Sequence, residues 1–334
     1  MNKISIIKSR AVLAFMLICG AVMLFIYTPN YIKESLFIKS PQTTIDTSLF
    51  NFTQNQIPII EIYQYQRQLK PLSQSQIEQL MDFNYLTTNI FLTDPRTKFL
   101  QTDIDVKEFL NKDLTIDTNV DGPQILIFHA HSMEMFKDSD PSDPTTGVIG
   151  VGAYLAQILE QQHGISVKHH TERFDMVEGR PHRLGSYERL EPVIKQILAD
   201  NPSIQMVIDL HRDGVGPHVA PMVTYINGKR TAQIMFVNGL SRRYRDGQIL
   251  PVQWLPNPYQ RENLALSLNL QLASNQLYPG LARRIYLLEF RYSLHMTPLS
   301  ILLEVGAQNN TLQEALNAMH PTANILASVL LANK

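Results

Sequence analysis

The stretch ILIFHAHSMEMF, residues 125–136, joins a strand-like apolar run to three potential metal ligands. Residues 125–128 form the continuous apolar run typical of a strand that is buried on both faces of a parallel sheet. His129, His131 and Glu134 follow within six positions. Ligands and chemistry in open α/β sheets lie outside the carboxyl ends of the strands, so this spacing indicates a metal site.

Two later apolar runs also end in ionisable groups that are unusual at the end of a buried strand. The run MVIDLHRD, residues 206–213, carries four of them: Asp209, His211, Arg212 and Asp213. The run ILLEVG, residues 301–306, carries Glu304 among apolar residues. The carboxyl ends of parallel strands gather on one edge of a sheet, so we expect the three stretches to meet there.

The chemistry that fits these residue types is zinc-assisted hydrolysis. Two histidines and one glutamate supply the three protein ligands of a catalytic zinc site, with a fourth position left for water. A further carboxylate is then needed as the general base that accepts a proton from water. Glu304 lies at a suitable strand end, and the apolar run before it is expected to raise its pKa toward the working range. The single cysteine, Cys19, lies in the amino-terminal apolar segment, so the metal must be held by histidine and carboxylate.

Each of these residues also has a purely structural explanation. A histidine taken alone is more often a surface or satisfied core residue than a ligand, and HAH can arise as a chance pair. Glu304 can simply form an ion pair with Arg212 or Arg291. The occurrence of all three features at successive strand ends favours the metal site.

From residue 122 onward, strand-like stretches alternate with helix-like stretches. Strands are predicted at 124–130, 165–170, 204–211, 220–226, 232–237 and 299–306, with the turn Asn227-Gly228 between the fourth and fifth. Helices are predicted near 151–162 and over 186–201, 261–278 and 311–332. Ser186 is expected to start the second helix, with Pro192 as a kink or a late start. This alternation predicts an α/β fold with a mostly parallel sheet covered by helices on both faces.

The amino-terminal segment predicts a transmembrane helix. Lys3, Lys8 and Arg10 precede an uncharged apolar run over residues 11–27. Seventeen helical residues span roughly 25 Å, enough for the hydrocarbon core with little tilt. The basic flank predicts a single-pass anchor in the cell membrane, with residues 1–10 in the cytoplasm and the rest outside. A cleaved signal peptide is the alternative, although its apolar region covers only about 7–15 residues.

Residues 28–119 are interpreted as an extracytoplasmic stalk with local helices, or as a small subdomain. They are rich in glutamine, asparagine and threonine, and no glycine occurs between Gly20 and Gly122. Helices are expected at 76–83, with Ser73 or Ser75 as the cap and Glu78 completing a capping box, and within 103–114. The change in composition predicts a boundary near residue 120, with residues 120–334 as the catalytic domain.

The charge of the chain argues against one broad class of function. The formal net charge is −1, the pI is about 6.8, and no run of lysine or arginine stands out. A nucleic-acid-binding protein normally carries a basic stripe, so no nucleic-acid partner is expected.

Four stretches resemble the stage II sporulation protein P family over roughly residues 120–334: ILIFHAHSMEMF, VIDLHRDG, YPGLARRIYLLEFRYSLH and SILLEVGAQNNTLQEAL. The resemblance implies a membrane-anchored zinc (Zn2+) N-acetylmuramoyl-L-alanine amidase with a mixed α/β sheet flanked by helices. The implied substrate is peptidoglycan, cut between the lactyl group of muramic acid and the L-alanine of the stem peptide, with endopeptidase action on crosslinks in addition. The implied place is the sporulation septum during engulfment, with the stage II sporulation proteins D and M as partners.

The resemblance also implies roles for individual residues. His129 and His211 lie where such amidases place their zinc histidines, and Glu304 lies where they keep the catalytic glutamate. Many related amidases carry the second ligand at the start of the following helix, but TTGVIGVGAYL has no carboxylate, so Glu134 is the candidate. His131 is the alternative, either as a ligand in place of His129 or as a supporting group. HAHSME has alanine and serine where threonines are expected, a change that should not disturb ligation.

Two other functions compete with the amidase. A catalytically inactive wall-binding or scaffold protein would have the same fold, but the presence of all the site positions favours an enzyme. A zinc peptidase that cuts only stem peptides would share both the fold and the ligands, and the cleavage products distinguish it from an amidase.

Overall fold

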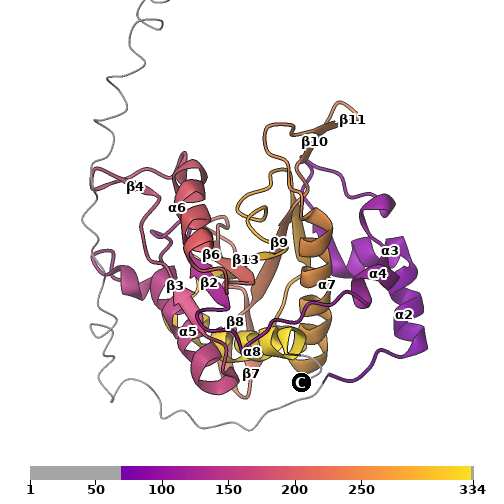
Figure 1. Ribbon diagram of the computed structural model, residues 1–334, viewed down its shortest axis with the longest axis horizontal. Coiled ribbons are helices and arrows are strands. Elements are labelled where there is room, and N and C mark those ends of the chain that lie inside the picture. Colours follow the sequence, from indigo (N-terminus) through magenta and orange to yellow (C-terminus); the bar gives the residue numbers. More distant parts are fainter. Residues whose placement is uncertain (1–68, 332–334) are drawn as a thin grey trace, which may run out of the picture. The chain divides into compact units, whose positions relative to one another are not determined.

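The computed structural model describes residues 69–331, which are built around one seven-stranded sheet. The strand order is β1-β12-β9-β13-β6-β2-β3. In that order the strands are β1 (Phe91–Thr93), β12 (Ile285–Leu288), β9 (Ile234–Gly239), β13 (Leu299–Ala307), β6 (Met206–Asp213), β2 (Ile125–Phe128) and β3 (Val167–His169). Neighbours are parallel except β9 and β13, which pair antiparallel. The predicted mixed, mostly parallel α/β sheet is therefore confirmed (Figure 1).

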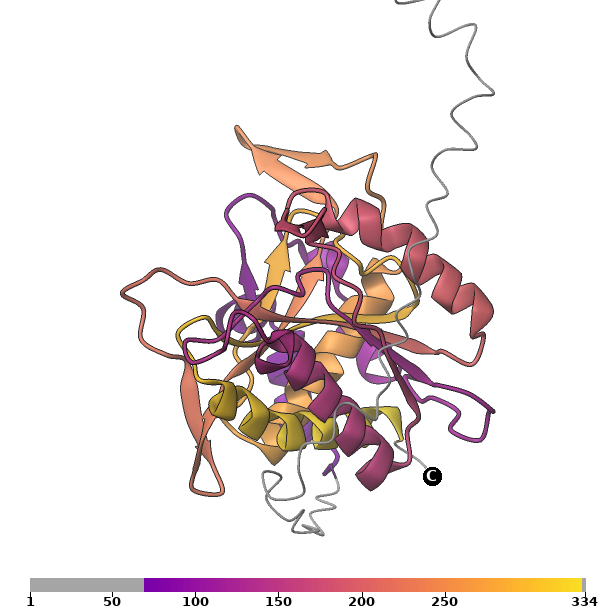
Figure 2. The same cartoon turned by 90° about the vertical axis from the view of Figure 1, so that its left-hand side faces the viewer.

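Four long helices flank the sheet: α5 (Val148–His163), α6 (Ser186–Asp200), α7 (Gln260–Leu277) and α8 (Leu312–Leu330). Alternate residues of β2 show which helices cover each face of the sheet. Ile125 and Ile127 belong to the large core formed with α5, α7 and α8, whereas Leu126 and Phe128 pack in a smaller core with Leu190 of α6. Helix α6 thus lies across the sheet from α5 and α8 (Figures 1 and 2).

The observed helices match the predicted ones, with local differences at their ends. Helix α5 begins before the predicted Val151 and stops at Gly164, which has a left-handed φ of 65°. Helix α6 starts at Ser186 as predicted, but its cap is Gly185, and Pro192 lies inside the helix. Helix α2 (Gln74–Met81) is capped by Ser73, with Gln76 rather than Glu78 completing the capping box.

The described part of the predicted stalk belongs to the same core as the sheet. Strand β1 extends the sheet by pairing with β12, and Phe91 and Phe109 are fully buried. The side-chain amide of Asn269 in α7 donates to the carbonyl of Phe109 at 2.9 Å. The other elements here are α3 (Phe83–Tyr85), a π-helical turn (Leu86–Ile90), a 3₁₀ turn (Gln101–Asp103) and α4 (Val106–Leu110). The stalk interpretation therefore fails for residues 69–116, and position 120 marks a change in composition rather than the edge of a folded unit.

The predicted anchor over residues 11–27 and the rest of the predicted stalk lie outside the described residues. Within residues 69–331, no helix combines the length and the apolar character needed to span a membrane.

Three small hairpins project from the sheet. They are β4 (Met176–Val177) with β5 (Arg180–Pro181), β7 (Val223–Ile226) with β8 (Lys229–Ala232), and β10 (Arg242–Arg245) with β11 (Gln248–Pro251). At the predicted turn, Asn227 and Gly228 both have positive φ, 51° and 75°, as a tight hairpin turn requires. The chain therefore forms β8 directly after the turn, and the predicted strand at 232–237 corresponds to the interior strand β9, which begins at Ile234.

Candidate metal centre and active site

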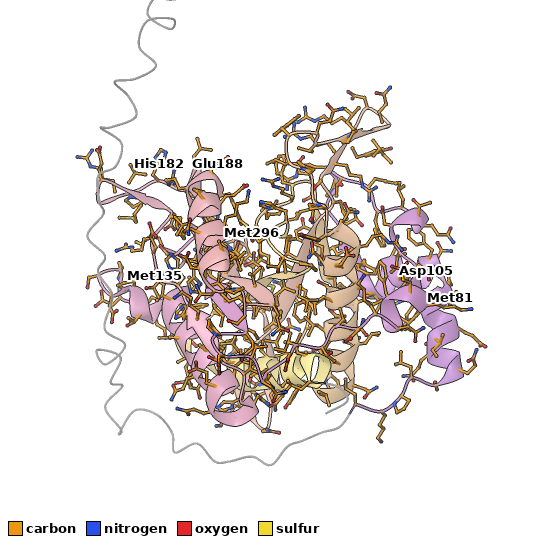
Figure 3. The ribbon with its side chains drawn as sticks, viewed as in Figure 1. Met81, Asp105, Met135, His182, Glu188 and Met296 are labelled. Atoms are coloured by element: carbon orange, nitrogen blue, oxygen red, sulfur yellow. The ribbon has the colours of Figure 1, made fainter. Side chains whose placement is uncertain are left out.

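Strands β2, β6 and β13 lie side by side and bring the three chemically active stretches together. Phe128 of β2 is in register with Asp209 of β6, and His211 is in register with Glu304 of β13. The predicted meeting of these stretches at one place on the sheet is confirmed. Figure 3 shows this region between α6 and β9, with Met296 labelled there.

The imidazole of His211 is buried between two carboxylates. Its Nε2 lies 2.7 Å from Oδ1 of Asp209, and its Nδ1 lies 3.2 Å from Oε2 of Glu134. Burial acts to lower the pKa of His211, but Asp209 and Glu134 outweigh it and hold that pKa well above the usual value. Asp209 is itself fixed, because it accepts from the backbone N–H of Ala130 at 2.9 Å and from Oγ of Ser293 at 2.7 Å.

Glu134 is almost fully buried and anchored from several sides. Its Oε2 accepts from the backbone N–H of Arg212 at 3.0 Å, and its Oε1 pairs with the guanidinium of Arg183 at 2.9 Å. Burial acts to raise the pKa of Glu134, but His211 and then Arg183 and Arg212 lower it below the usual value. The Arg212 side chain also donates to the carbonyl of Met135 at 3.0 Å, which fastens the 131–135 loop to the end of β6.

His131, rather than His129, lies beside His211 and Glu134. The rings of His131 and His211 are 5.3 Å apart between centroids, and Nδ1 of His131 is 3.3 Å from Oγ of Ser186. Burial, with smaller contributions from His211 and Arg183, lowers the pKa of His131 to about 4. The neutral ring that results is the form that binds metal.

His129, the zinc ligand expected from the sequence, has both ring nitrogens engaged elsewhere. Its Nδ1 donates to the carbonyl of Leu210 at 2.8 Å, and its Nε2 lies 2.8 Å from Nε2 of His169. Gly152 of α5 is so close that a Cβ there would lie 2.8 Å from the His129 ring. The His129 side chain therefore lies against α5, on the opposite side of the sheet from α6, because it continues the alternation of Ile125 and Ile127. The chain leaves the strand after Phe128, and this turn is what carries His131 to His211.

Glu304 is half-buried, with one carboxyl oxygen enclosed by the protein as expected of a general base. Among residues 69–331, its Oε2 is one of the buried side-chain atoms without a hydrogen-bond partner. Burial, with repulsion from Glu134 and Asp213, raises the pKa of Glu304 to about 8, although His211 acts in the opposite direction. The alternative ion pairs are not formed: Arg291 binds Glu191 at 2.7 Å, and Arg212 donates to backbone carbonyls.

The donor chemistry of this cluster fits zinc, although the ligands do not converge as a finished cage. Within residues 69–331, no group of three or more histidine, cysteine, aspartate or glutamate side chains has metal-site geometry. The arrangement of His211 nevertheless shares one feature with the usual support of a zinc histidine: one ring nitrogen, Nε2, donates to the carboxylate of Asp209. The other, Nδ1, faces the carboxylate of Glu134, itself a possible ligand. Besides the ring of His211, this place contains the buried Oε2 of Glu304, which has no hydrogen-bond partner among the described residues.

Several supporting residues had no predicted role in the site, although Asp209 is among the ionisable groups of its strand-like run. Asp209 precedes His211 by two positions in a strand, so the two side chains share a face, and this spacing is a usable signal. Ser132 and the backbone N–H of Met133 bind Asp175 at 2.5 and 2.9 Å and hold the loop between His131 and Glu134. Asp175 and Arg183 come from the segment around the β4–β5 hairpin, where no sequence pattern points toward the site.

Two solved amidase structures show distant similarity to the chain. The CwlD amidase of Clostridioides difficile in complex with the GerS lipoprotein is 12% identical, with a TM-score of 0.38, covering 62% of this chain and 95% of that chain. An N-acetylmuramoyl-L-alanine amidase from Clostridium difficile is 14% identical, with a TM-score of 0.37, covering 64% of this chain and 97% of that chain. Similarities this distant do not bear on the chemistry of the site.

The sequence comparisons identify the family. The stage II sporulation protein P of Bacillus subtilis is 25% identical over 236 residues, which are 65% of this chain and 54% of that protein. The chain thus matches about half the length of that curated relative. The family model for stage II sporulation protein P matches residues 48–329, most of the chain. The chain therefore belongs to the stage II sporulation protein P family.

Proposed function

We propose that the chain is a zinc-dependent N-acetylmuramoyl-L-alanine amidase that hydrolyses peptidoglycan, with endopeptidase action on peptide crosslinks as a second activity. The observation that carries the proposal is the buried, partnerless carboxyl oxygen of Glu304 in register with His211, beside Glu134 and His131. A metal-dependent hydrolase needs a group that transfers a proton, and this group must lie next to the residues that bind the metal ion. This cluster offers both.

His131, Glu134 and His211 are the residues that would hold zinc in this proposal. Asp209 would keep His211 in the orientation that leaves Nδ1 on the side of Glu134. Zinc, when bound, supplies a Lewis acid that polarises the scissile carbonyl and lowers the pKa of water. His129, expected as a ligand from the sequence, would instead support the backbone at Leu210, next to His211.

Glu304 would act as the general base and then as the general acid. Hydrolysis breaks the amide C–N bond, adds the oxygen of water to the lactyl carbonyl carbon, and moves one proton to the nitrogen of L-alanine. Because burial raises the pKa of Glu304 to about 8, both its protonated and its ionised forms are accessible near neutral pH. Its Oε2 can therefore accept the proton from water and later release it to the departing amine.

The proposed location is the cell membrane at the sporulation septum. The apolar run over residues 11–27 and its basic flank support a single-pass anchor with the catalytic domain outside. Family membership supports a role in septal wall degradation during engulfment and makes the stage II sporulation proteins D and M the proposed partners.

Product analysis tests this function. The full-length, zinc-loaded protein is incubated with purified peptidoglycan, and the soluble products are identified by mass spectrometry. We expect stem peptides with a free amino-terminal L-alanine and glycan strands that retain the lactyl group. Chelation should abolish the cleavage, and added zinc should restore it. Cleavage confined to bonds within stem peptides would instead identify a peptidase, and binding without cleavage would identify a wall-binding protein.

A further inference from the structure

A row of aromatic side chains leads from the candidate metal centre toward the β10–β11 hairpin. The ring of Tyr187, at the start of α6, lies 5.5 Å from His131 and 5.6 Å from Tyr292, centroid to centroid. Tyr292 in turn lies 6.4 Å from Phe290. Tyr187, Tyr292 and Phe290 are all partly exposed. The row therefore begins at a proposed ligand, and each of these three rings keeps part of its surface exposed.

Arg243 continues the row to an exposed tryptophan. Its guanidinium lies 4.8 Å from the ring centre of Phe290 and 5.7 Å from that of Trp254, so it is stacked between the two rings. Glu289 forms an ion pair with Arg243, with 3.3 Å between its Oε2 and Nε of the guanidinium. We use the name aromatic row for Tyr187, Tyr292, Phe290 and Trp254.

Packing within the protein accounts for Tyr187 and Tyr292, which lie against core clusters, but not for the far end of the aromatic row. Trp254 is 66% exposed, and Ile249 and Leu250 of the neighbouring strand β11 are exposed as well. Tyr292 has a φ of 49°, a left-handed backbone conformation that is strained for a bulky residue. Strain of this kind persists where the surrounding structure holds it, and it is concentrated at binding and catalytic sites.

We infer that the aromatic row binds a glycan strand of amino sugars; this inference rests on the proposed function. The C–H faces of pyranose rings stack on aromatic rings, which offer large, rigid and amphipathic contact areas. A row that extends from the cluster to a hairpin suits a polymer rather than a small ligand. The aromatic row begins next to His131. A glycan strand bound along the row therefore places its lactyl amides beside the proposed catalytic groups.

Trp254 provides a direct optical test, since it is the one tryptophan in the sequence. The full-length, zinc-loaded protein is titrated with glycan strands from which the stem peptides have been removed, so that cleavage does not interfere. A saturable change in tryptophan emission is expected. Unchanged emission would overturn the inference. A change caused by vesicles of anionic phospholipid but not by glycan strands would also overturn it, because the hairpin would then contact lipid.

A matched pair of variants identifies the residue responsible. Trp254→Ala should bind the same glycan strands about tenfold more weakly by calorimetry, as expected for a well-packed aromatic anchor. Tyr225→Ala is the control, because Tyr225 is also 66% exposed but belongs to the β7–β8 hairpin, which lies away from β10–β11 (Figure 1). Equal affinities for both variants and the wild type would overturn the inference.

The two proposals fail in different ways. Cleavage of peptidoglycan with the expected products, combined with wild-type binding and KM for Trp254→Ala, would refute the aromatic row and leave the amidase intact. Glycan binding that depends on Trp254 without any amide cleavage would refute the amidase, and the aromatic row would stand.

Discussion

The orientation of His211 is determined by the two carboxylates on either side of it. Asp209 takes the Nε2 side at 2.7 Å, so Nδ1 faces Glu134 at 3.2 Å and is the nitrogen that the proposed function assigns to zinc. Asp209 is fully buried and has its own donors in Ala130 and Ser293, so it cannot readily turn away. A supporting carboxylate of this kind fixes the ring and raises its basicity as a ligand.

The first prediction distinguishes the two histidines of HAH. His131→Ala should lose most of its zinc, because two remaining protein ligands hold the ion poorly, whereas His129→Ala should keep it. Elemental analysis of the purified full-length variants gives the result. His169→Ala is the control for His129, since it removes the other half of the same buried pair. Greater zinc loss in His129→Ala than in His131→Ala would restore His129 as the ligand.

Part of the site can be predicted from residue types and spacing alone. Glu134, His211 and Glu304 come together as the strand-end argument requires. The choice between His129 and His131 cannot be made in that way, because it depends on where the strand stops. Strand alternation sends His129 toward α5, and only the turn after Phe128 brings His131 to the other side.

The arrangement of strands explains why distant segments meet. Strands β2, β6 and β13 are parallel neighbours, as the alternation of strands and helices predicts. The antiparallel pairing of β9 with β13 has no local sequence signal, because it follows from the route of the chain through the β7–β8 hairpin. Strand β1 is only three residues long, too short for periodicity to reveal, so its place in the sheet could not be predicted.

The second prediction tests whether residues 69–116 belong to the catalytic core. Phe109 is fully buried, and the guanidinium of Arg261 in α7 lies 5.3 Å from its ring centre. Phe109→Ala should therefore lower the free energy of unfolding of the whole domain by about 3–5 kcal/mol. Met81→Ala is the control, because Met81 is 48% exposed, and it should change stability by about 0.5 kcal/mol or less. A normal urea midpoint for Phe109→Ala would contradict a shared core.

The third prediction concerns stability in acid at the junction of β1 and β12. Asp94, just after β1, accepts from Nε of Arg96 at 2.8 Å and from the hydroxyl of Tyr286 in β12 at 2.7 Å. The hydrogen bond from Arg96, opposed by burial and aided by Tyr286, lowers the pKa of Asp94 to about 2. The folded pKa is below the unfolded value of about 3.9, so the ionised carboxylate stabilises the fold fully above that value.

That stabilisation should disappear as the pH falls from about 4 toward 2. Urea unfolding of the wild type and Asp94→Asn across this range measures it: the difference in free energy of unfolding should be largest above about pH 5 and should shrink in acid. Asp246→Asn, in the exposed β10–β11 turn, is the control. A difference between the wild type and Asp94→Asn that stays constant from pH 5 to about 2 would contradict the assignment.

At the scale of the whole molecule, the account requires the described domain to lie outside the membrane. The fourth prediction is that the full-length protein sediments with membranes and that external protease removes the bulk of it from intact protoplasts. The physical reason is the basic flank before residues 11–27, which keeps the amino terminus inside. A lysed sample is the control for protease access. Protection of residues 69–331 in intact protoplasts would contradict this topology.

The most direct test of the central claim is the turnover of Glu304→Gln on purified peptidoglycan. Glutamine keeps the size of the side chain and can still hydrogen-bond, but it cannot accept a proton. The variant should fold, keep its zinc and release stem peptides about 10²–10⁴-fold more slowly than the wild type, the usual contribution of general acid–base catalysis. Turnover within a factor of a few of the wild type, measured on folded and zinc-loaded Glu304→Gln, would contradict the account.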